Sequence, residues 1–239
     1  MPAKRPRHRA LYLQVRDALA ERITSGEWRP GSAIANEIDL ARDLGVSSGT
    51  VRKALELMEA QRLITRRRGR GTFVSDQTAG HLSARFNNLR GPDGEPVRST
   101  VAAVEIAEGT AKGHEAARMR FRAGDAVYRI SRVRRLAGKN VLVESATLPA
   151  ALFPGLADRR GVADSISALA QAYGIQLGKA EERVSLGVPP AAIAATLGIA
   201  PGAPILLLDR VVFMLDGRAV EWCLTYCHLA GSYYLAELG

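Results

Sequence analysis

The apolar positions in the first 60 residues recur at helical spacing. The first such series consists of Leu11, Val15, Leu19 and Ile23. Because side chains four positions apart share one face of a helix, this series predicts a helix over residues 10–25. A second helix is expected to run from a cap at Asn36 to Gly45, and a third to begin at the cap Ser47. The inner face of the third helix is expected to consist of Val51, Ala54, Leu55 and Met58.

The turn between the second and third helices is three residues long, Gly45-Val46-Ser47. This is the spacing of a helix-turn-helix, in which the second helix of the motif enters the major groove of DNA with its amino end first. Thr50 can then donate a hydrogen bond to a phosphate. Arg52, one turn into the helix, can reach a base edge or a phosphate.

A basic hairpin is expected directly after the third helix. Two short β-prone runs, residues 63–65 and 72–74, are joined by RRRGRG at positions 66–71. Four arginines on a glycine-rich tip can lie along a DNA groove and contact phosphates. An arginine cluster can also be an ordinary solvated turn, but its place beside a helix-turn-helix favours DNA binding. The first third of the chain is therefore predicted to be a winged helix-turn-helix.

The pattern changes to short alternating runs after a polar stretch. Strands are expected at 96–105, 127–136, 141–148, 179–187, 205–215 and 218–228, and helices at 111–120, 164–173 and 190–197. Strands that pair as hairpins with interspersed helices predict an α+β domain with a mainly antiparallel sheet. We expect a DNA-binding domain at 1–76, a linker at 77–84 and a second domain at 85–239.

The distribution of charge also distinguishes the two predicted domains. The chain of 239 residues has a net charge of +9, and residues 1–78 contribute 15 Lys and Arg against 9 Asp and Glu. The basic excess is therefore concentrated in the first third, which indicates a polyanionic partner for that domain.

The composition favours a soluble protein of a reducing compartment, and we expect a cytoplasmic location. The two cysteines, Cys223 and Cys227, are too few for a disulfide framework, and with His228 they do not match a tetrahedral zinc pattern. No apolar run is long enough to span a bilayer, and the basic amino terminus lacks the apolar segment of a secretory signal. We expect no membrane partner, no metal, no cofactor and no catalytic residue.

Three charged residues are expected to meet on the hairpin of the second domain. Arg132 and Arg134 alternate along one strand, and Glu144 lies on the strand that pairs with it. The two guanidiniums could receive an anionic group of a ligand, and the carboxylate could hold a hydroxyl or amine group of the same molecule. The alternative is that Arg132 and Glu144 form a cross-strand ion pair that supports the sheet.

The amino-terminal motifs resemble those of the GntR transcriptional regulators. The matching stretches are YLQVRDALAERITSGEWRPGSAI, LARDLGVSSGTVRKALELMEAQRLI and RGRGTFV, which cover nearly all of residues 10–75. The spacing and the resemblance together imply this set of DNA-binding residues: Glu37, Ser47, Ser48, Thr50, Arg52, Lys53, Arg68, Gly69 and Arg70. Ile38 and Ser48 stand where the family usually has arginine, so two expected contacts are missing and the operator sequence cannot be copied from the family.

The second domain resembles the UTRA effector-binding domain of the HutC-type subfamily, which has a chorismate-lyase-like fold. The matching features include Arg-x-Arg at 132–134, the Glu144 strand that ends in Leu-Pro, and GRAVE at 217–221. The resemblance implies an effector pocket formed by Arg132, Arg134, Glu144, Ser165, Glu221 and Tyr226. Ser167 stands where the family often has an aromatic residue, and Tyr226 is followed by Cys227 where the pocket tyrosine is usual. The ligand can therefore differ from the phosphorylated sugars of the subfamily.

These observations predict a DNA-binding transcriptional regulator, expected to be a repressor, whose binding to double-stranded operator DNA is controlled by a small anionic effector. A homodimer is expected, because two helix-turn-helix units read the half-sites of a palindrome. One alternative is a chorismate-lyase-like enzyme domain with a basic appendage, although no His or Lys base accompanies the arginine pair. Another is an architectural protein that binds DNA without sequence preference. Neither the effector nor the direction of its effect follows from the sequence.

Overall fold

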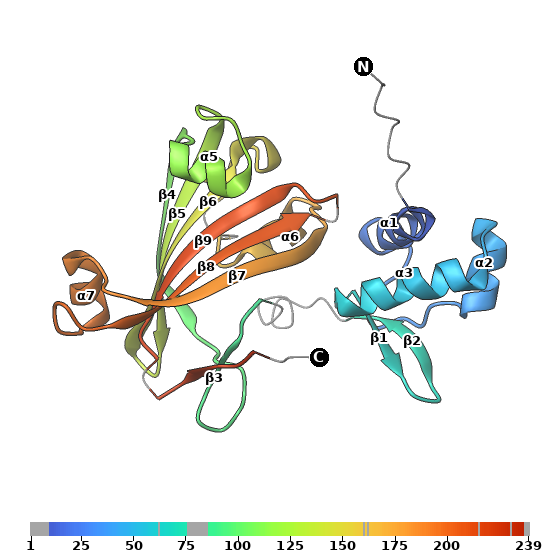
Figure 1. Ribbon diagram of the computed structural model, residues 1–239, viewed down its shortest axis with the longest axis horizontal. Coiled ribbons are helices and arrows are strands. Elements are labelled where there is room, and N and C mark those ends of the chain that lie inside the picture. Colours follow the sequence, from blue (N-terminus) through green and yellow to red (C-terminus); the bar gives the residue numbers. More distant parts are fainter. Residues whose placement is uncertain are drawn as a thin grey trace, which may run out of the picture. The chain divides into compact units, whose positions relative to one another are not determined.

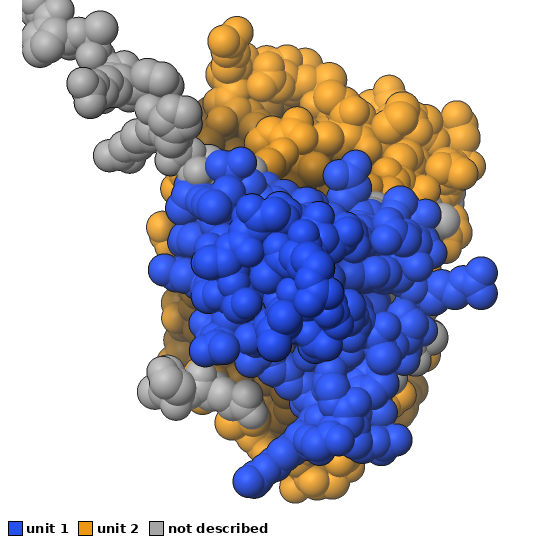
Figure 2. Space-filling view, turned by 90° about the vertical axis from the view of Figure 1, so that its right-hand side faces the viewer, with its two compact units in different colours: residues 1–78 blue, residues 79–239 orange. Residues whose placement is uncertain are grey.

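The computed structural model describes residues 10–61, 63–75, 86–159, 161, 163–214, 216–229 and 231–236. The chain forms two compact units, residues 1–78 and 79–239, which are coloured separately in Figure 2. We call them the N-terminal unit and the C-terminal unit. The predicted linker, residues 77–84, lies outside the described residues.

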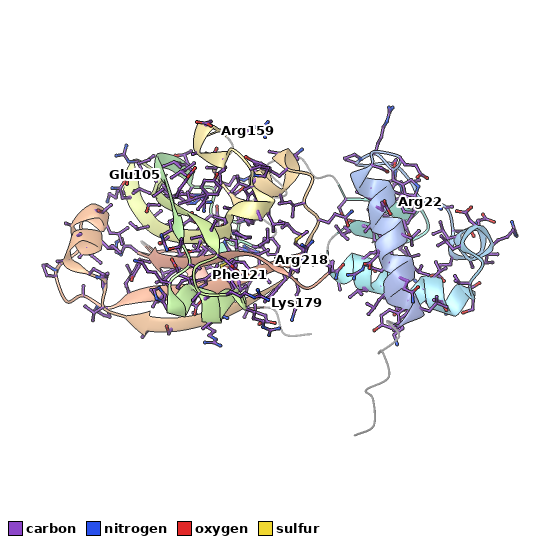
Figure 3. The ribbon with its side chains drawn as sticks, turned by 90° about the horizontal axis from the view of Figure 1, so that it is seen from above. Arg22, Glu105, Phe121, Arg159, Lys179 and Arg218 are labelled. Carbon is purple, nitrogen blue, oxygen red and sulfur yellow. The ribbon has the colours of Figure 1, made fainter. Side chains whose placement is uncertain are left out.

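The described residues of the N-terminal unit form three helices followed by a hairpin (Figure 1). Its elements are α1 (Leu11–Thr24), α2 (Glu37–Leu44), α3 (Ser48–Ala60), β1 (Ile64–Arg67) and β2 (Gly71–Val74). The Asn36 side chain accepts hydrogen bonds from the backbone N–H groups of Ile38 and Asp39, and Gly45 ends α2 with a left-handed φ of 64°. Arg22 of α1, which Figure 3 labels, also bonds to Asp43 of α2 at 2.5 Å. These contacts fix α2 at its first turn and tie its last turn to α1.

The C-terminal unit is built on one antiparallel sheet. Its six strands lie in the order β4-β5-β6-β9-β8-β7. They span β4 (Thr100–Thr110), β5 (Ala126–Leu136), β6 (Lys139–Pro149), β7 (Leu177–Gly187), β8 (Ile205–Met214) and β9 (Ala219–Cys227). The strand predicted at 96–105 begins later and runs longer, because β4 pairs with the full length of β5 from Thr100 to Thr110. Pairing with a neighbour therefore overrides the local preference.

Helices cover both faces of this sheet. They are α5 (Gly113–Met119), the 3₁₀ turns η1 (Ala150–Leu152) and η2 (Leu156–Asp158), α6 (Ile166–Ala172) and α7 (Ala191–Leu197). One face packs against α6, η1 and η2 through a core that includes Ile130, Leu148 and Leu169. The other face packs against α5, where Met119 contacts Val211 and Phe213.

Two short strands join the start and the end of the C-terminal unit. In β3 (Leu89–Arg90) and β10 (Tyr233–Tyr234), Arg90 lies opposite Tyr233 and Leu89 opposite Tyr234. The N–H of Leu235 donates to the carbonyl of Asn88 at 2.8 Å. We call residues 86–90 and 233–235 the clasp. The clasp therefore holds residues 86–90 against residues 233–235.

Candidate DNA interface and effector site

The start of α3 presents its backbone and two hydroxyl groups together. Ser47 caps the helix, because its Oγ accepts a hydrogen bond from the N–H of Thr50 at 3.2 Å. The two hydroxyls of Ser47 and Thr50 also lie 2.9 Å apart. Ser48 and Gly49 follow the cap at the first turn. Small side chains at this end of a helix permit a close approach of a phosphate to the N–H groups.

Glu37 connects three elements of the predicted interface. Its carboxylate, at the first position of α2, accepts from Nε of Arg52 on α3 at 2.9 Å and from Nη2 of Arg66 on the hairpin at 3.4 Å. The hydrogen bond that Arg52 donates to Glu37 raises the pKa of Arg52 above its usual value. A carboxylate near DNA repels phosphates, and here both of its oxygens are neutralised by arginines. Glu37 therefore orients Arg52 in addition to any contact of its own.

One arginine of the hairpin packs against an aromatic ring, and two others are exposed at its tip. Arg67 stacks over the ring of Phe73, with its guanidinium carbon 4.9 Å from the ring centroid. Arg68, Gly69 and Arg70 form the exposed turn between β1 and β2. Within the described part of the chain, no ion pair involves the Arg68 or Arg70 side chain. Lys53, also a predicted contact, lies over the ring of Tyr12 with its Nζ 4.6 Å from the centroid. The two tip arginines are therefore the cations of the hairpin that remain available to a polyanion.

In the C-terminal unit, the predicted arginine pair meets Glu144 on the α6 face of the sheet. Arg132 lies directly opposite Glu144, and its Nη1 is 3.3 Å from Oε2 of that carboxylate. Nε of Arg134 donates to Oε1 of Glu144 at 2.8 Å. Both arginines also hold the loop before α6, since Arg132 bonds to the carbonyl of Ala163 at 2.6 Å and Arg134 to the carbonyl of Asp164. The predicted cross-strand ion pair is thus present, and it fixes the approach to α6.

A second buried carboxylate extends this group of charges. Glu221 of β9 is fully buried, 3.7 Å from Nη1 of Arg132 and 3.8 Å from Nη2 of Arg210 on β8. Neither oxygen of Glu221 makes a hydrogen bond within the described residues, and the same is true of Nη2 of Arg132. Buried polar atoms in this state are costly unless another group bonds to them. Nε of Arg210 is in the same state, so two acceptors and two donors of this charged group lack hydrogen-bond partners within the described residues.

Burial dominates the chemistry of this region. It raises the pKa of Glu221, although Arg132 and Arg210 act in the opposite direction. It also raises the pKa of the neighbouring Cys223 thiol to about 12. The thiol is therefore neutral at physiological pH and is no nucleophile. The site can bind polar groups, and its described residues provide no activated base.

The structure brings together most of the predicted effector residues, with one correction. Ser165 caps α6 by accepting from the N–H of Ala168 at 3.1 Å, next to the carbonyls that the arginines hold. Tyr226 does not join the group. It lies opposite Val143, whereas its neighbour Thr225 lies opposite Glu144. Successive residues of a strand point to opposite faces, so Tyr226 faces away from the cluster.

Arg210 is the member of the cluster that the sequence did not reveal. It lies within the apolar strand ILLLDRVVFM, beside Asp209. Asp209 faces the opposite side of the sheet, where it pairs with Arg118 at 3.0 Å and accepts from the indole N–H of Trp222 at 2.8 Å. A charged pair inside an otherwise apolar strand was the available signal, because charges are rarely buried without partners.

Comparisons with known proteins match both parts of the chain. Residues 11–74 match the model of the bacterial regulatory proteins of the gntR family, and residues 95–230 match the model of the UTRA domain. The chain belongs to the GntR family and carries a UTRA domain. The predicted α+β fold, with a helix-turn-helix followed by an antiparallel sheet domain, is confirmed.

Relatives of this GntR-family chain are similar over most of their length. The mannosyl-D-glycerate transport/metabolism system repressor MngR of Escherichia coli (strain K12) is 26% identical over 218 residues, with 90% of each chain covered. The HTH-type transcriptional repressor NagR of Bacillus subtilis (strain 168) is 26% identical over 221 residues, which cover 88% of this chain and 87% of NagR. The crystal structure of PhnF from Mycobacterium smegmatis is 26% identical and covers 94% of this chain and 99% of its own, with a TM-score of 0.54.

The family assigns the general function. The chain is a DNA-binding transcriptional regulator and not an enzyme, so the lyase alternative is set aside. None of the helices in the described ranges has the length and hydrophobicity that a bilayer-spanning segment needs.

Proposed function

We propose that this regulator is a homodimeric repressor of the HutC type that binds operator DNA in the cytoplasm and responds to a small anionic effector. The observation that carries the effector part is the buried group around Glu221. There, Nη2 of Arg132 and both oxygens of Glu221 make no hydrogen bond within the described residues. A ligand with hydroxyl or amine donors and an acceptor could satisfy all three atoms.

The charge of the site supports an anionic effector. Arg132, Arg134 and Arg210 face three carboxylates, namely Glu144, Glu221 and Glu182. Burial raises the pKa of Glu221, and Nη2 of Arg132 and Nε of Arg210 make no hydrogen bond within the described residues. An anionic group on the ligand could accept hydrogen bonds from these two donors.

On the DNA side, we propose that the start of α3 and the hairpin tip make the contacts. The contacting residues are Glu37, Ser47, Ser48, Thr50, Arg52, Lys53, Arg68, Gly69 and Arg70. With Arg52 held by Glu37, and Ile38 and Ser48 in place of arginines, the two tip arginines carry a large share of the contact with phosphates.

Replacing Arg68 and Arg70 together by alanine is expected to weaken binding to every DNA sequence. Each lost phosphate contact releases about one counterion fewer, so the slope of log K against log salt concentration falls in magnitude by about 2. The measurement is fluorescence anisotropy of a labelled fragment from the gene's own upstream region at several KCl concentrations.

Arg29→Ala is the matched control for the double variant. Arg29 is an exposed arginine in the turn whose Gly31 bonds to the carbonyl of Val74, at the end of β2 away from the tip. Its loss is expected to leave the slope unchanged. If the double variant retained the wild-type slope, the hairpin tip would not be part of the DNA interface.

Arg134→Gln is expected to abolish stabilisation by the effector and the release of DNA by it, with DNA affinity in the absence of ligand unchanged. The arginine is half-buried at the edge of the site and bonds to Glu144 and Asp164. Thermal shifts of the full chain are measured with inorganic phosphate, with glucose 6-phosphate as a simple phosphorylated sugar, and with mannosyl-D-glycerate. A compound at 100 times its dissociation constant stabilises the wild type by about 2.7 kcal/mol.

The control for Arg134→Gln is Arg135→Gln, the same change at the next position of β5. Arg135 is exposed and bonds to Asn140, so its variant is expected to keep the full thermal shift. Equal shifts in wild type and Arg134→Gln would reduce Arg134 to a support of the sheet.

A further inference from the structure

We propose that Arg210 couples the buried Glu221 site to the clasp, so that a change at the site alters how firmly the clasp holds. This inference rests on the proposed effector site and adds the route by which the site reaches the rest of the chain. Phe86, at one end of the clasp, is the first residue of the C-terminal unit that the structure describes.

The Arg210 guanidinium contacts both the site and the clasp. Nη2 lies 3.8 Å from Oε2 of Glu221. Nη1 donates to the carbonyl of Phe86 at 2.7 Å, and the guanidinium carbon lies 5.9 Å from the centroid of the Phe86 ring. One planar group therefore joins a buried carboxylate of the sheet to the backbone of the clasp.

A second carboxylate ties Arg210 to the other strand of the clasp. Oε1 of Glu182 on β7 lies 4.0 Å from Nη1 of Arg210, and its Oε2 accepts from the Tyr234 hydroxyl at 2.5 Å. The Asn88 amide donates to the same hydroxyl at 2.9 Å. The charged groups Glu144, Arg132, Glu221, Arg210 and Glu182 thus alternate in sign across the sheet and end at Tyr234.

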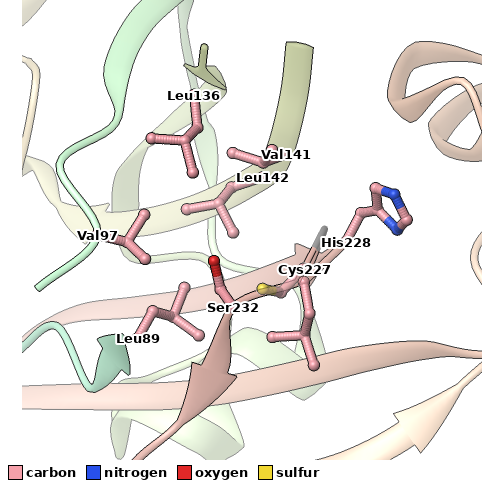
Figure 4. A pocket seen from close by; sticks show the side chains of 9 residues that line it. Leu89, Val97, Leu136, Val141, Leu142, Cys227, His228 and Ser232 are labelled. Carbon is pink, nitrogen blue, oxygen red and sulfur yellow. The ribbon is translucent and has the colours of Figure 1, made fainter. Parts of the chain in front are cut away.

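Apolar packing beneath the clasp is incomplete. A small cluster made by Leu89, Val97 and Leu142 holds the clasp against the sheet. Figure 4 shows an open hollow in this cluster, lined also by Cys227 and Ser232. Because a gap removes dispersion contacts, the hydrogen bonds around Arg210 and Glu182 account for a larger share of the hold. The stability of the clasp therefore depends on whether the Arg210 guanidinium interacts mainly with Glu221 or with Glu182 and the Phe86 carbonyl.

Glu221 and Glu182 compete for the same cation. A ligand group that bonds to Glu221, or that favours its neutral form, weakens the attraction of Glu221 for Arg210. The guanidinium then interacts more strongly with Glu182 and with the Phe86 carbonyl. Binding of a ligand at Glu221 therefore strengthens the contacts that hold the clasp.

The test needs neither ligand nor operator. Glu221→Gln removes the charge at the site and keeps its shape, and hydrogen–deuterium exchange of the full chain reports on peptides covering residues 86–97 and 231–236. We expect exchange in these peptides to slow by about two- to fivefold. In an Arg210→Gln background, the Glu221→Gln change is expected to have no effect at the clasp, because the coupling residue is gone.

Two further variants keep the test decisive. Arg210→Lys keeps the charge but is too short to reach both partners, and it replaces Arg210→Gln if that variant does not fold. Glu181→Gln is the matched control, since Glu181 is exposed on β7 and pairs with Lys179. The coupling would be overturned if Glu221→Gln left hydrogen–deuterium exchange in the clasp peptides unchanged. It would also be overturned if Glu221→Gln changed this exchange equally in the presence and absence of Arg210. Effector binding is measured separately by thermal shift, so either proposal can fail while the other stands.

Discussion

Replacement of Arg132 by methionine is expected to lower the free energy of unfolding of the C-terminal unit by about 3–5 kcal/mol. Arg132 is 2% exposed and is the nearest cation to two buried carboxylates, those of Glu144 and Glu221. Methionine resembles the aliphatic stem of arginine but carries no guanidinium, so Arg134 is the arginine that still pairs with Glu144. The loop before α6 also loses the hydrogen bond to the Ala163 carbonyl. Removing one partner from a buried ion group costs more than the group contributes when intact.

The measurement is urea unfolding in a Trp28→Phe background. The chain has two tryptophans, so Trp222 on β9 then reports on the C-terminal unit alone. Arg135→Met is the control, because it makes the same change at an exposed position of the same strand. Its effect is expected to stay within about 0.5 kcal/mol. If the two variants unfolded at the same urea concentration, the buried charges around Arg132 would not depend on it.

This expectation separates the two arginines that the sequence presented as a pair. Arg132 is embedded in the sheet, so its loss is expected to damage the fold and cannot report on ligand binding. Arg134 is half-buried at the edge of the site, so its loss leaves Arg132 to neutralise Glu144. The sequence shows two identical side chains two residues apart. Their roles differ because Arg132 lies beside the buried Glu221 of β9, whereas Arg134 lies at the edge of the site.

Local signals were sufficient for the N-terminal unit. The caps at Asn36 and Ser47 and the left-handed Gly45 are short-range features, and each is found where the pattern placed it. The hairpin arginines are likewise contiguous in the sequence. What the pattern did not predict was the contact of Glu37 with Arg52 and Arg66, because it joins residues 15 and 29 positions apart.

The effector site depended on long-range pairing. Arg132 and Glu144 lie on adjacent strands of one hairpin, and their proximity followed from the turn between them. Arg210 reaches Glu221 through the β8–β9 pairing and reaches Phe86 across 124 positions of the chain. Strand order cannot be read from local periodicity, which explains why Arg210 was missed. The misplacement of Tyr226 was avoidable, since it lies five residues after Glu221 and strand alternation puts the two on opposite faces.

Acid is expected to remove a large contribution that Glu115 makes to stability. Glu115 of α5 is 4% exposed, and hydrogen bonds from Arg129, both at 2.7 Å, lower its pKa from 4.5 to about 2. Because its pKa is lower in the folded state, the unfolded chain binds the proton first as the pH falls. The stabilisation is therefore complete above pH 4.5 and is lost as the pH falls from 4.5 towards 2. At about 1.4 kcal/mol per unit, it amounts to about 3 kcal/mol at neutral pH.

The comparison of wild type with Glu115→Gln isolates this contribution. In the same Trp28→Phe background, the difference in unfolding free energy is expected to be about 3 kcal/mol at pH 7 and less than about half of that at pH 3. Glu105→Gln is the control, because Glu105 is an exposed carboxylate on β4, labelled in Figure 3. Its difference from wild type is expected to be small at every pH. A Glu115→Gln difference that did not shrink in acid would mean that Glu115 acts through its shape and its bond to the Lys112 N–H, and not through its charge.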